Sequence, residues 1–233
     1  MFCATAETFN DPYDCALTFD PYADDAELRE LKDYISETND LNEDQKAFIG
    51  KTIAERQSST SSKLIDDMNQ QIRSSYKICS LSERADSLLM WAHYGDLHKG
   101  FVMEYDFTSL PPHDPMTLSL WPVIYDQQIY DATHIYLSAL NGRKFNNSIA
   151  VISAMHKASD WEYEKEWRIV IPSPKDQPNQ SFPAPLTAVH MGAKISVENE
   201  HAIKAIAAKL NIPTYKMKLS NSKFEMLSIP TEK

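Results

Sequence analysis

The residues best suited to take part in a chemical reaction lie in one acidic segment, Trp161 to Arg168. On an extended backbone, alternate side chains point to opposite faces. This spacing puts three acids and an arginine on one face, Glu162, Glu164, Glu166 and Arg168, and apolar or aromatic side chains on the other, Tyr163, Trp167, Ile169 and Ile171. Like charges at i and i+2 raise one another's pKa. The pattern predicts an acid/base or cation-stabilising site, without assigning separate roles to the three glutamates. The alternative is a solvent-facing edge strand whose charges discourage aggregation.

A second group lies between Ser80 and Gly100. Ser80 and Ser82 precede a short helix expected over Asp86–Tyr94, which would deliver His93 and Tyr94 to one end. A histidine can act as base or ligand and a tyrosine can stack on a ring, although a helix histidine is more often a satisfied structural group. His93 and His98 lack the spacing of a zinc-peptidase pair, so no metal site is predicted.

These residues need strands and short helices to position them. The expected elements after residue 75 are strands at Tyr76–Leu81, Phe101–Asp106, Trp121–Tyr125, Trp161–Ile171 and Ala188–Met191, a helix over Phe145–His156, a helix capped by Ser196, and two last strands separated by Ser220–Ser222. This order predicts an α+β fold, with a small mixed or antiparallel split sheet and flanking helices.

The first third of the chain predicts an acidic helical region. Its expected helices carry Leu28, Leu31 and Ile35 in the first, Phe48, Ile49 and Ile53 after an Asn42 N-cap in the second, and Leu64, Ile65, Met68 and Ile72 in the third. The serine-rich stretch Ser58–Ser62 is expected to be a mobile loop. Residues 1–233 would form a single domain, with 24–75 a helical insertion or lid. The alternative is a solvated helical subdomain without a catalytic part.

Composition narrows the class of protein. Hydrophobic residues make up 42% and charged residues 24% of the 233, as in ordinary globular proteins. There is neither an apolar run long enough for a membrane span nor a secretion signal, so a cytoplasmic protein is expected. Cys3, Cys15 and Cys79 are too widely spaced for a disulfide framework and are expected to be reduced thiols.

The formal charge of −10 is concentrated near the N-terminus. Residues 1–75 hold 16 acidic and 7 basic side chains. An acidic surface repels phosphate backbones, so a broad nucleic-acid-binding surface is not expected. The charge does not exclude binding of a nucleic-acid end or of a single base in a pocket.

The sequence resembles the bacterial domain of unknown function 2971. The likeness is carried by Phe9–Pro12, Cys79–Glu83, Leu89–Tyr94 with His98–Gly100, and Lys157 with Trp161–Arg168, and continues more weakly from His190–Lys194 to the end. Members usually start with an additional strand and helix ahead of the segment that here begins at Phe2, so this chain is expected to lack that portion.

The order of parts also resembles a distant ADP-ribosyltransferase, a fold that holds NAD in a cleft between two small sheets. This resemblance implies that Ser80 and Ser82 support the nicotinamide, and that Glu164 and Glu166 bind the ribose and stabilise an oxocarbenium-like transition state, oriented by Arg168. The expected substrate-binding set is Ser80, Ser82, Trp91, His93, Tyr94, Lys157 and Trp161. The implied activity is that of an NAD-dependent transferase or glycohydrolase, of toxin or phage-defence type, with NAD as substrate. Whether the acceptor is a protein or a nucleic acid is left unassigned.

Two other classes remain. A non-catalytic binding or regulatory module would use the same groove for a ligand. A metal-dependent nuclease would use the acids to hold Mg²⁺ and Arg168 or Lys157 to face phosphate. An NAD enzyme needs an aromatic-walled cleft beside the glutamates, whereas a magnesium site needs converging carboxylates.

Overall fold

The computed structural model describes most of the chain: residues 1–20, 42–140, 148–173, 180–181 and 183–231, with positions 25, 26, 30, 33 and 37. The helix predicted around Leu28, Leu31 and Ile35 lies outside the described residues.

The described residues form short strands and helices that alternate irregularly along the chain, as in an α+β protein. In chain order they are β1 (Phe2–Thr5), η1 (Ala6–Thr8), β2 (Leu17–Thr18), α2 (Glu43–Ser75), β3 (Tyr76–Ser82), α3 (Leu88–His93), β4 (Phe101–Tyr105), η2 (Phe107–Ser109), α4 (Pro115–Leu118), β5 (Leu120–Pro122), β6 (Ile124–Asp126), β7 (Tyr130–Asp131), α5 (Thr133–Leu140), α6 (Ser148–Met155), β8 (His156–Ala158), η3 (Ser159–Glu164), β9 (Glu166–Pro172), β10 (Gln180–Ser181), β11 (Leu186–Met191), α7 (Val197–Leu210), β12 (Thr214–Leu219) and β13 (Met226–Pro230). The predicted fold class is confirmed.

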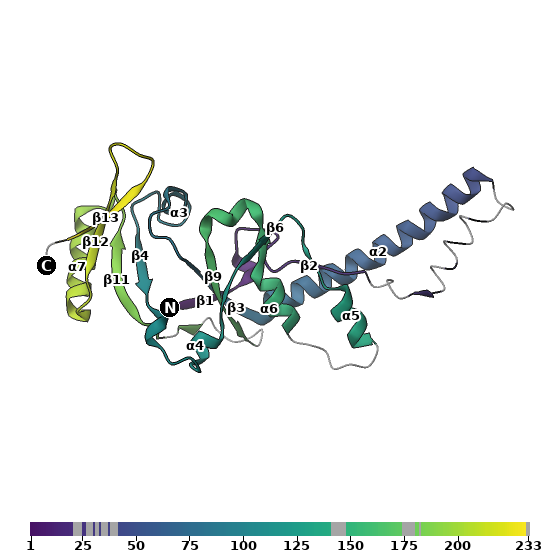
Figure 1. The fold of residues 1–233 in the computed structure, drawn as a ribbon, viewed down its shortest axis with the longest axis horizontal. Coiled ribbons are helices and arrows are strands. Elements are labelled where there is room, and N and C mark those ends of the chain that lie inside the picture. The colour runs from purple at the N-terminus through teal and green to yellow at the C-terminus, as the bar shows by residue number, and fades with distance from the viewer. Residues whose placement is uncertain are drawn as a thin grey trace.

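Two separate sheets form the frame of the molecule (Figure 1). The larger has the strand order β10-β1-β3-β9-β5 and the smaller β13-β12-β11-β4. Strands β3 and β9 pair antiparallel along their whole length, from Tyr76 opposite Pro172 to Ser82 opposite Glu166. Helix α7 connects the parallel strands β11 and β12 and lies at one end of the molecule, whereas α2 extends from the larger sheet toward the other end. The predicted split sheet with flanking helices is present.

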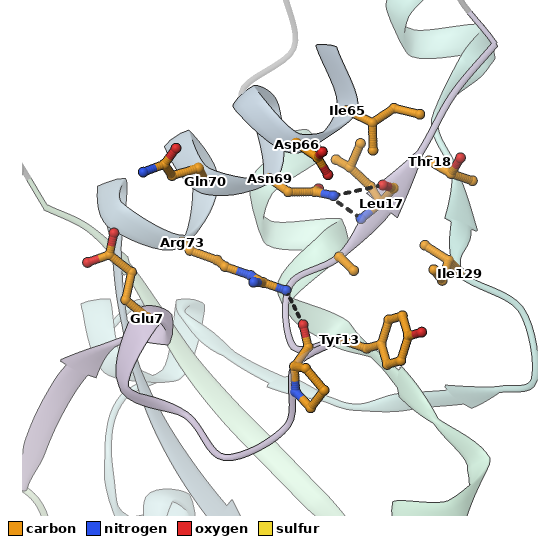
Figure 2. A pocket seen from close by; sticks show the side chains of 12 residues that line it. Glu7, Tyr13, Leu17, Thr18, Ile65, Asp66, Asn69, Gln70, Arg73 and Ile129 are labelled. Carbon is orange, nitrogen blue, oxygen red and sulfur yellow. Dashed lines mark hydrogen bonds between the residues drawn. The ribbon is translucent and has the colours of Figure 1, made fainter. Parts of the chain in front are cut away.

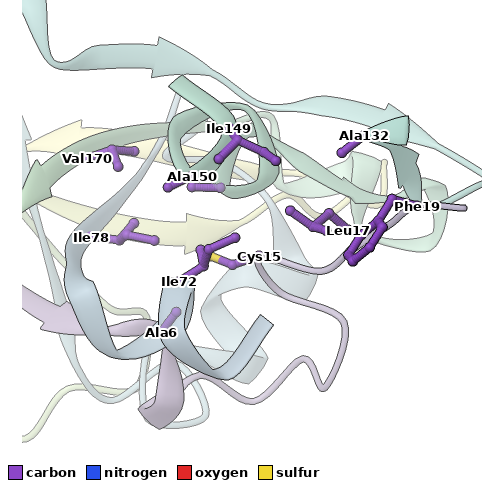
Figure 3. Close-up of a cluster of buried hydrophobic side chains, with 11 residues drawn as sticks. Ala6, Cys15, Leu17, Phe19, Ile72, Ile78, Ala132, Ile149, Ala150 and Val170 are labelled. Atoms are coloured by element: carbon purple, nitrogen blue, oxygen red, sulfur yellow. The ribbon is translucent and has the colours of Figure 1, made fainter. Parts of the chain in front are cut away.

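The main apolar core lies between the larger sheet and the helices beside it (Figure 3). Its buried members are Ala6, Cys15, Leu17, Phe19, Ile72, Ile78, Ala132, Ile149, Ala150, Ala154 and Val170. Ile78 of β3 and Val170 of β9 are directly paired and point into it. A smaller core of Trp91, Met217 and Met226 joins α3 to the smaller sheet. Each sheet therefore has its own apolar support.

Helix α2 corrects part of the sequence prediction. Asn42 is its N-cap, as predicted, because its side chain accepts from the Gln45 N–H while the Gln45 side chain accepts from the Asn42 N–H. However, α2 runs without a break through Ser58–Ser62, so the predicted loop and two-helix division are wrong. Each serine costs a helix only a few tenths of a kcal/mol relative to alanine. The C-terminal part of α2 is held in place because Ile65, Met68 and Ile72 pack on the core. Phe48, predicted to point inward, is 72% exposed.

The other helix boundaries follow the prediction closely. Ser196 caps α7 by accepting from the Asn199 N–H, as predicted. Ser87 caps α3, which is shorter than the predicted helix. The strand predicted over Trp121–Tyr125 is instead two strands in different sheets, β5 and β6. No helix in the described part of the chain is long and apolar enough to cross a membrane.

Candidate functional site

The acidic segment is not one long strand. Residues 159–164 form the 3-10 helix η3, Lys165 is left-handed with φ 45°, and β9 begins only at Glu166. The strand predicted to start at Trp161 is therefore wrong, and the alternation of faces fails before Glu166. Glu162 lies on the surface, with a side chain 59% exposed and paired with Lys165.

The kink at Lys165 brings two of the three glutamates into the interior. Glu164 precedes the kink and Glu166 follows it, and their side chains are only 3% and 4% exposed. Arg168, two residues further along β9, is completely buried. The alternative interpretation, a solvent-facing edge strand, is wrong, because β9 lies between β3 and β5 and this face is buried.

A single network of charges joins these side chains. Lys157 Nζ lies 2.6 Å from Glu164 Oε2 and 2.9 Å from Glu166 Oε2, so one ammonium bridges both carboxylates. Arg168 donates from Nε to Glu166 Oε1 at 2.8 Å and from Nη2 to Glu166 Oε2 at 3.1 Å. Its Nη1 donates to the Ala154 carbonyl at 2.7 Å. We call these four side chains, together with Asp14, the charge network.

Asp14 is the member that sequence reasoning missed. It lies in the turn before β2, far from the acidic segment in sequence, and its Oδ1 is 2.5 Å from Arg168 Nη2 in an ion pair. Burial raises the pKa of Asp14, while the charges of Arg168 and Lys157 oppose this effect. Nothing in the spacing of Asp14 relative to Arg168 could have signalled this contact.

The opposite charges decide the protonation of the network. Burial would raise the pKa of Glu166, but Arg168 and Lys157 outweigh it and hold that pKa below its ordinary value. Burial would likewise lower the pKa of Lys157, but Glu166 and Glu164 outweigh it and raise that pKa. Glu166 is thus a carboxylate and Lys157 an ammonium at neutral pH.

The two predicted serines support the glutamates. The Ser82 hydroxyl donates to the main-chain carbonyl of Glu164 at 2.6 Å. The Ser80 side chain hydrogen-bonds the Glu166 carboxylate and helps to lower its pKa. Both serines share the face of β3 that meets the charge network, because Ser80 is opposite Arg168 and Ser82 is opposite Glu166.

Aromatic side chains lie between the charge network and the surface. The Tyr94 hydroxyl donates to Glu164 Oε1 at 2.7 Å, and the Tyr94 residue is 51% exposed. Burial and this hydrogen bond raise the pKa of Tyr94 to about 12, so the phenol stays protonated at neutral pH. Ring centroids are 6.2 Å apart for Tyr94 and His93, 6.4 Å for His93 and Tyr163, and 6.2 Å for Tyr163 and Trp161. We call these four side chains the aromatic row.

Lys157 connects the aromatic row to the network, because its Nζ lies 4.9 Å from the centroid of a Trp161 ring. A cation at this distance is attracted to the face of the ring. The structure therefore brings together nine of the ten predicted site residues through the network and the row: Ser80, Ser82, His93, Tyr94, Lys157, Trp161, Glu164, Glu166 and Arg168.

Trp91 is the predicted site residue that lies elsewhere. It is 2% exposed in the smaller core and donates from Nε1 to the Ala85 carbonyl at 2.8 Å. It supports the loop after α3, since its carbonyl accepts from the His98 N–H and a Cβ on Gly95 would lie 2.6 Å from its ring. Three successive residues of that loop, Asp96–His98, have positive φ. Trp91 thus positions the end of α3 from which His93 and Tyr94 project.

A cavity of about 660 Å³ lies between the N-terminal segment, residues 7–18, and helix α2 (Figure 2). Its lining is Glu7, Pro12, Tyr13, Ala16, Leu17, Thr18, Ile65, Asp66, Asn69, Gln70, Arg73 and Ile129. Arg73 hydrogen-bonds the carbonyls of Pro12 and Asp14, and Asn69 bonds both the N–H and the carbonyl of Leu17. Residues of α2 that line the cavity therefore hold the segment that carries Asp14. The Asp14 carboxylate of that segment contacts the charge network.

The carboxylates of the network are already matched by cations. Among the described residues, no group of three or more His, Cys, Asp or Glu side chains is arranged to hold a metal ion. Lys157 and Arg168 occupy the positions between the acids that a cation would otherwise take.

Fold and site together define an α+β protein with two small sheets and a buried carboxylate and cation network under an aromatic row. A family model described as "Protein of unknown function (DUF2971)" matches residues 90–169. The chain is thus similar to this family over residues 90–169, which confirms the resemblance there. This segment includes Tyr94, Lys157, Glu164, Glu166 and Arg168. No curated protein and no solved structure matches the chain.

Proposed function

We propose that the chain is an NAD-dependent ADP-ribosyltransferase or glycohydrolase that cleaves the N-glycosidic bond of its nucleotide, with Glu164 as the catalytic carboxylate. One observation carries this proposal: Glu164 is buried, yet the hydroxyl of half-exposed Tyr94 covers its Oε1 at 2.7 Å. If the phenol moves aside, a substrate gains direct access to one carboxylate oxygen while Lys157 still holds the other.

The chemistry of the bond suits a carboxylate in this position. Cleavage of a glycosidic bond develops positive charge on the sugar ring, and a fixed carboxylate beside the anomeric carbon stabilises that charge. A preorganised group acts more strongly in a site from which water is excluded than in solution. Glu164 is preorganised by Lys157 at Oε2 and by the Ser82 hydroxyl at its carbonyl.

The aromatic row supports a nucleotide substrate. Nucleobases and nicotinamide have planar rings that stack on aromatic side chains, and such stacking contributes about 1–3 kcal/mol per base. Tyr94 contacts Glu164, and the rings of His93, Tyr163 and Trp161 continue the row from it. The acceptor of the ADP-ribosyl group would be a protein or a nucleic acid, or water in a glycohydrolase.

Glu166 and Arg168 take a positioning role in this proposal. Both oxygens of Glu166 are bonded to Arg168, and Oε2 also contacts Lys157. The Glu166 N–H further donates to the Tyr125 hydroxyl at 2.8 Å. Glu166 orients Lys157, and Lys157 orients Glu164.

The test compares Glu164→Gln with Glu162→Gln, a matched control from the same turn whose side chain is exposed. We expect the chain to consume NAD and release nicotinamide, the Glu164→Gln variant to lose about 10²–10³-fold in kcat, and Glu162→Gln to keep full activity. Equal turnover by wild type and Glu164→Gln would exclude Glu164 as the catalytic group.

The cavity beside α2 favours a second candidate, a ligand-binding or regulatory module. Its volume suits a small molecule, and its wall carries the segment of Asp14. Nucleotide binding without turnover that is lost in Tyr13→Ala, on the rim of the cavity, but kept in Glu164→Gln would support this candidate over the enzyme.

A further inference from the structure

Two of the three cysteines face each other across neighbouring strands. Strands β1 and β3 pair antiparallel, with Ala4 opposite Ile78 and Thr5 opposite Lys77. The same register puts Cys3 opposite Cys79, and the Cys79 side chain hydrogen-bonds the Cys3 sulfur. Facing Cβ atoms in an antiparallel pair are about 4.5–5.5 Å apart, and a disulfide needs about 3.5–4.5 Å. A small local adjustment would therefore suffice for a bond.

The two thiols differ in access to solvent. Cys3 is completely buried and Cys79 is partly exposed. Cys79 is opposite Ile169 of β9, on the face of the larger sheet that points away from Ser80, Ser82 and the charge network. The third cysteine, Cys15, is buried in the main core with Leu17 and Ile72. The pair is thus separate from the candidate active site.

We propose that Cys3 and Cys79 form a reversible dithiol–disulfide site, oxidised by peroxide and reduced by small thiols. This inference does not rest on the proposed enzymatic function. It identifies a covalent modification of the sheet itself, which would tie β1 to β3 one residue before Ser80.

The oxidation balances with hydrogen peroxide as the oxidant. Once the pair has lost one proton to solvent and Cys3 is the thiolate, the proton that remains on Cys79 passes to Cys3. The Cys79 thiolate then attacks a peroxide oxygen, the O–O bond breaks, and the departing hydroxide leaves as water after taking up a proton from solvent. The product is a sulfenic acid on Cys79. The Cys3 sulfur then attacks the Cys79 sulfur, the S–S bond forms, and the sulfenic hydroxyl leaves as a second water with the Cys3 proton. Both sulfurs are oxidised and one peroxide is reduced.

The electrostatics of the pair favour loss of its first proton from Cys3, so proton transfer from Cys79 to Cys3 must precede the attack on peroxide. The hydrogen bond from Cys79 lowers the pKa of Cys3 against the opposing effect of burial, and the nearby Lys77 adds to the lowering. The same hydrogen bond, with burial, raises the pKa of Cys79. The pair therefore loses its first proton more readily than an isolated buried thiol such as Cys15, whose pKa burial raises to about 12.

The experiment treats the folded full chain with hydrogen peroxide, removes the peroxide, unfolds the chain in urea, blocks the remaining thiols with N-ethylmaleimide, and maps the modified peptides by mass spectrometry. We expect a product lighter by two hydrogens, a peptide that joins Cys3 to Cys79, and a single blocked thiol at Cys15. Dithiothreitol should restore three blocked thiols. The Cys15→Ser variant should form the same bridge, whereas Cys3→Ser and Cys79→Ser should not.

The wild-type peptide map decides the outcome, because it does not depend on whether a variant folds. Three blocked thiols after peroxide treatment, irreversible oxidation of Cys79 without a bridge, or a bridge that involves Cys15 would each overturn the proposal. Circular dichroism melting of the variants separates loss of the bridge from loss of the fold.

Discussion

The ion pairs beside the two sheets differ in their exposure to solvent. Beside the larger sheet, the side chains of Lys157, Glu164, Glu166 and Arg168 are all at most 4% exposed and bind one another. Beside the smaller sheet, ion pairs stay partly in water: Lys216 and Glu200 are 2.7 Å apart with side chains 21% and 23% exposed. The core there is apolar, with Trp91, Met217 and Met226. Among the described residues of the two regions, the buried set of ions lies beside the larger sheet.

This difference bears on function because buried ions are expensive. Removing a charge from water costs several kcal/mol per ion, and well-packed apolar residues often replace a buried ion pair with equal or greater stability. The smaller sheet shows that this fold supports an apolar interior. Stability therefore does not explain the charge network, which agrees with the role proposed for Glu164.

Backbone strain is present beside the charge network, as it is in the loop after α3. Lys165 is left-handed with φ 45°, between the two buried glutamates. A residue other than glycine in this conformation costs about 1–2 kcal/mol, and such strain clusters at functional sites. The kink that carries this strain directs Glu164 and Glu166 to the same Lys157 ammonium.

The largest expected effect comes from removing one cation of the network. Arg168→Ala leaves Asp14 buried without its ion-pair partner and leaves Glu166 with only Lys157, so we expect a loss of about 3–5 kcal/mol in the free energy of unfolding. The matched change in the smaller sheet, Lys216→Ala, breaks a partly exposed pair and should cost less than about 1 kcal/mol. Urea unfolding measures both, and losses of equal size would show that the two regions do not differ as argued.

A smaller effect is expected on the dependence of stability on pH. The pKa of Glu166 is lowered in the folded state, so its contribution is present above the unfolded-state pKa and is lost as pH falls through the folded pKa. The pKa of Asp14 is raised, so its contribution has the opposite sign and is lost as pH rises through the folded pKa.

Two neutral variants separate these contributions. Glu166→Gln should flatten the loss of stability on acidification, and Asp14→Asn should steepen it, when the urea midpoint is followed downward from neutral pH. Glu200→Gln is the control from the smaller sheet: the pKa of Glu200 is lowered by Lys216 and Lys204, but the pair is partly exposed, so its change in slope should be smaller. The same slope in Glu166→Gln and wild type would contradict the assignment of Glu166 as a buried, paired carboxylate.

The sequence predicted well those features that depend on local pattern. The strands at β3, β4 and β11, the caps Asn42 and Ser196, and the last hairpin follow from alternation and capping chemistry. The break expected at Ser58–Ser62 was wrong because serine only weakens a helix, and packing of residues 65–72 on the core outweighs that weakness.

The site was harder to predict, since it depends on contacts distant in sequence. The glutamates and Arg168 were identified from residue type and spacing, and Lys157 from the family resemblance. The structure brings Glu164, Glu166, Lys157 and Arg168 together. The kink at Lys165 was not predictable, because lysine is not a residue that signals a left-handed conformation. The contact of Asp14 with Arg168 depends on tertiary packing of the N-terminal segment, for which no local pattern exists.

The smallest effect on stability is expected at Tyr94, where the two regions again differ. Tyr94→Phe removes the hydrogen bond to Glu164 Oε1 and should cost about 0.5–1.5 kcal/mol. Tyr215→Phe, in the smaller sheet, keeps the ring that stacks on His190 at 4.9 Å and should change stability by less than about 0.5 kcal/mol. Urea unfolding measures both. Because Tyr94 covers the proposed catalytic oxygen, Tyr94→Phe should also change NAD turnover, whereas Tyr215→Phe should not. Unchanged turnover in Tyr94→Phe together with the expected loss of stability would limit the Tyr94 hydroxyl to a structural role and leave Glu164 to be tested by its own substitution.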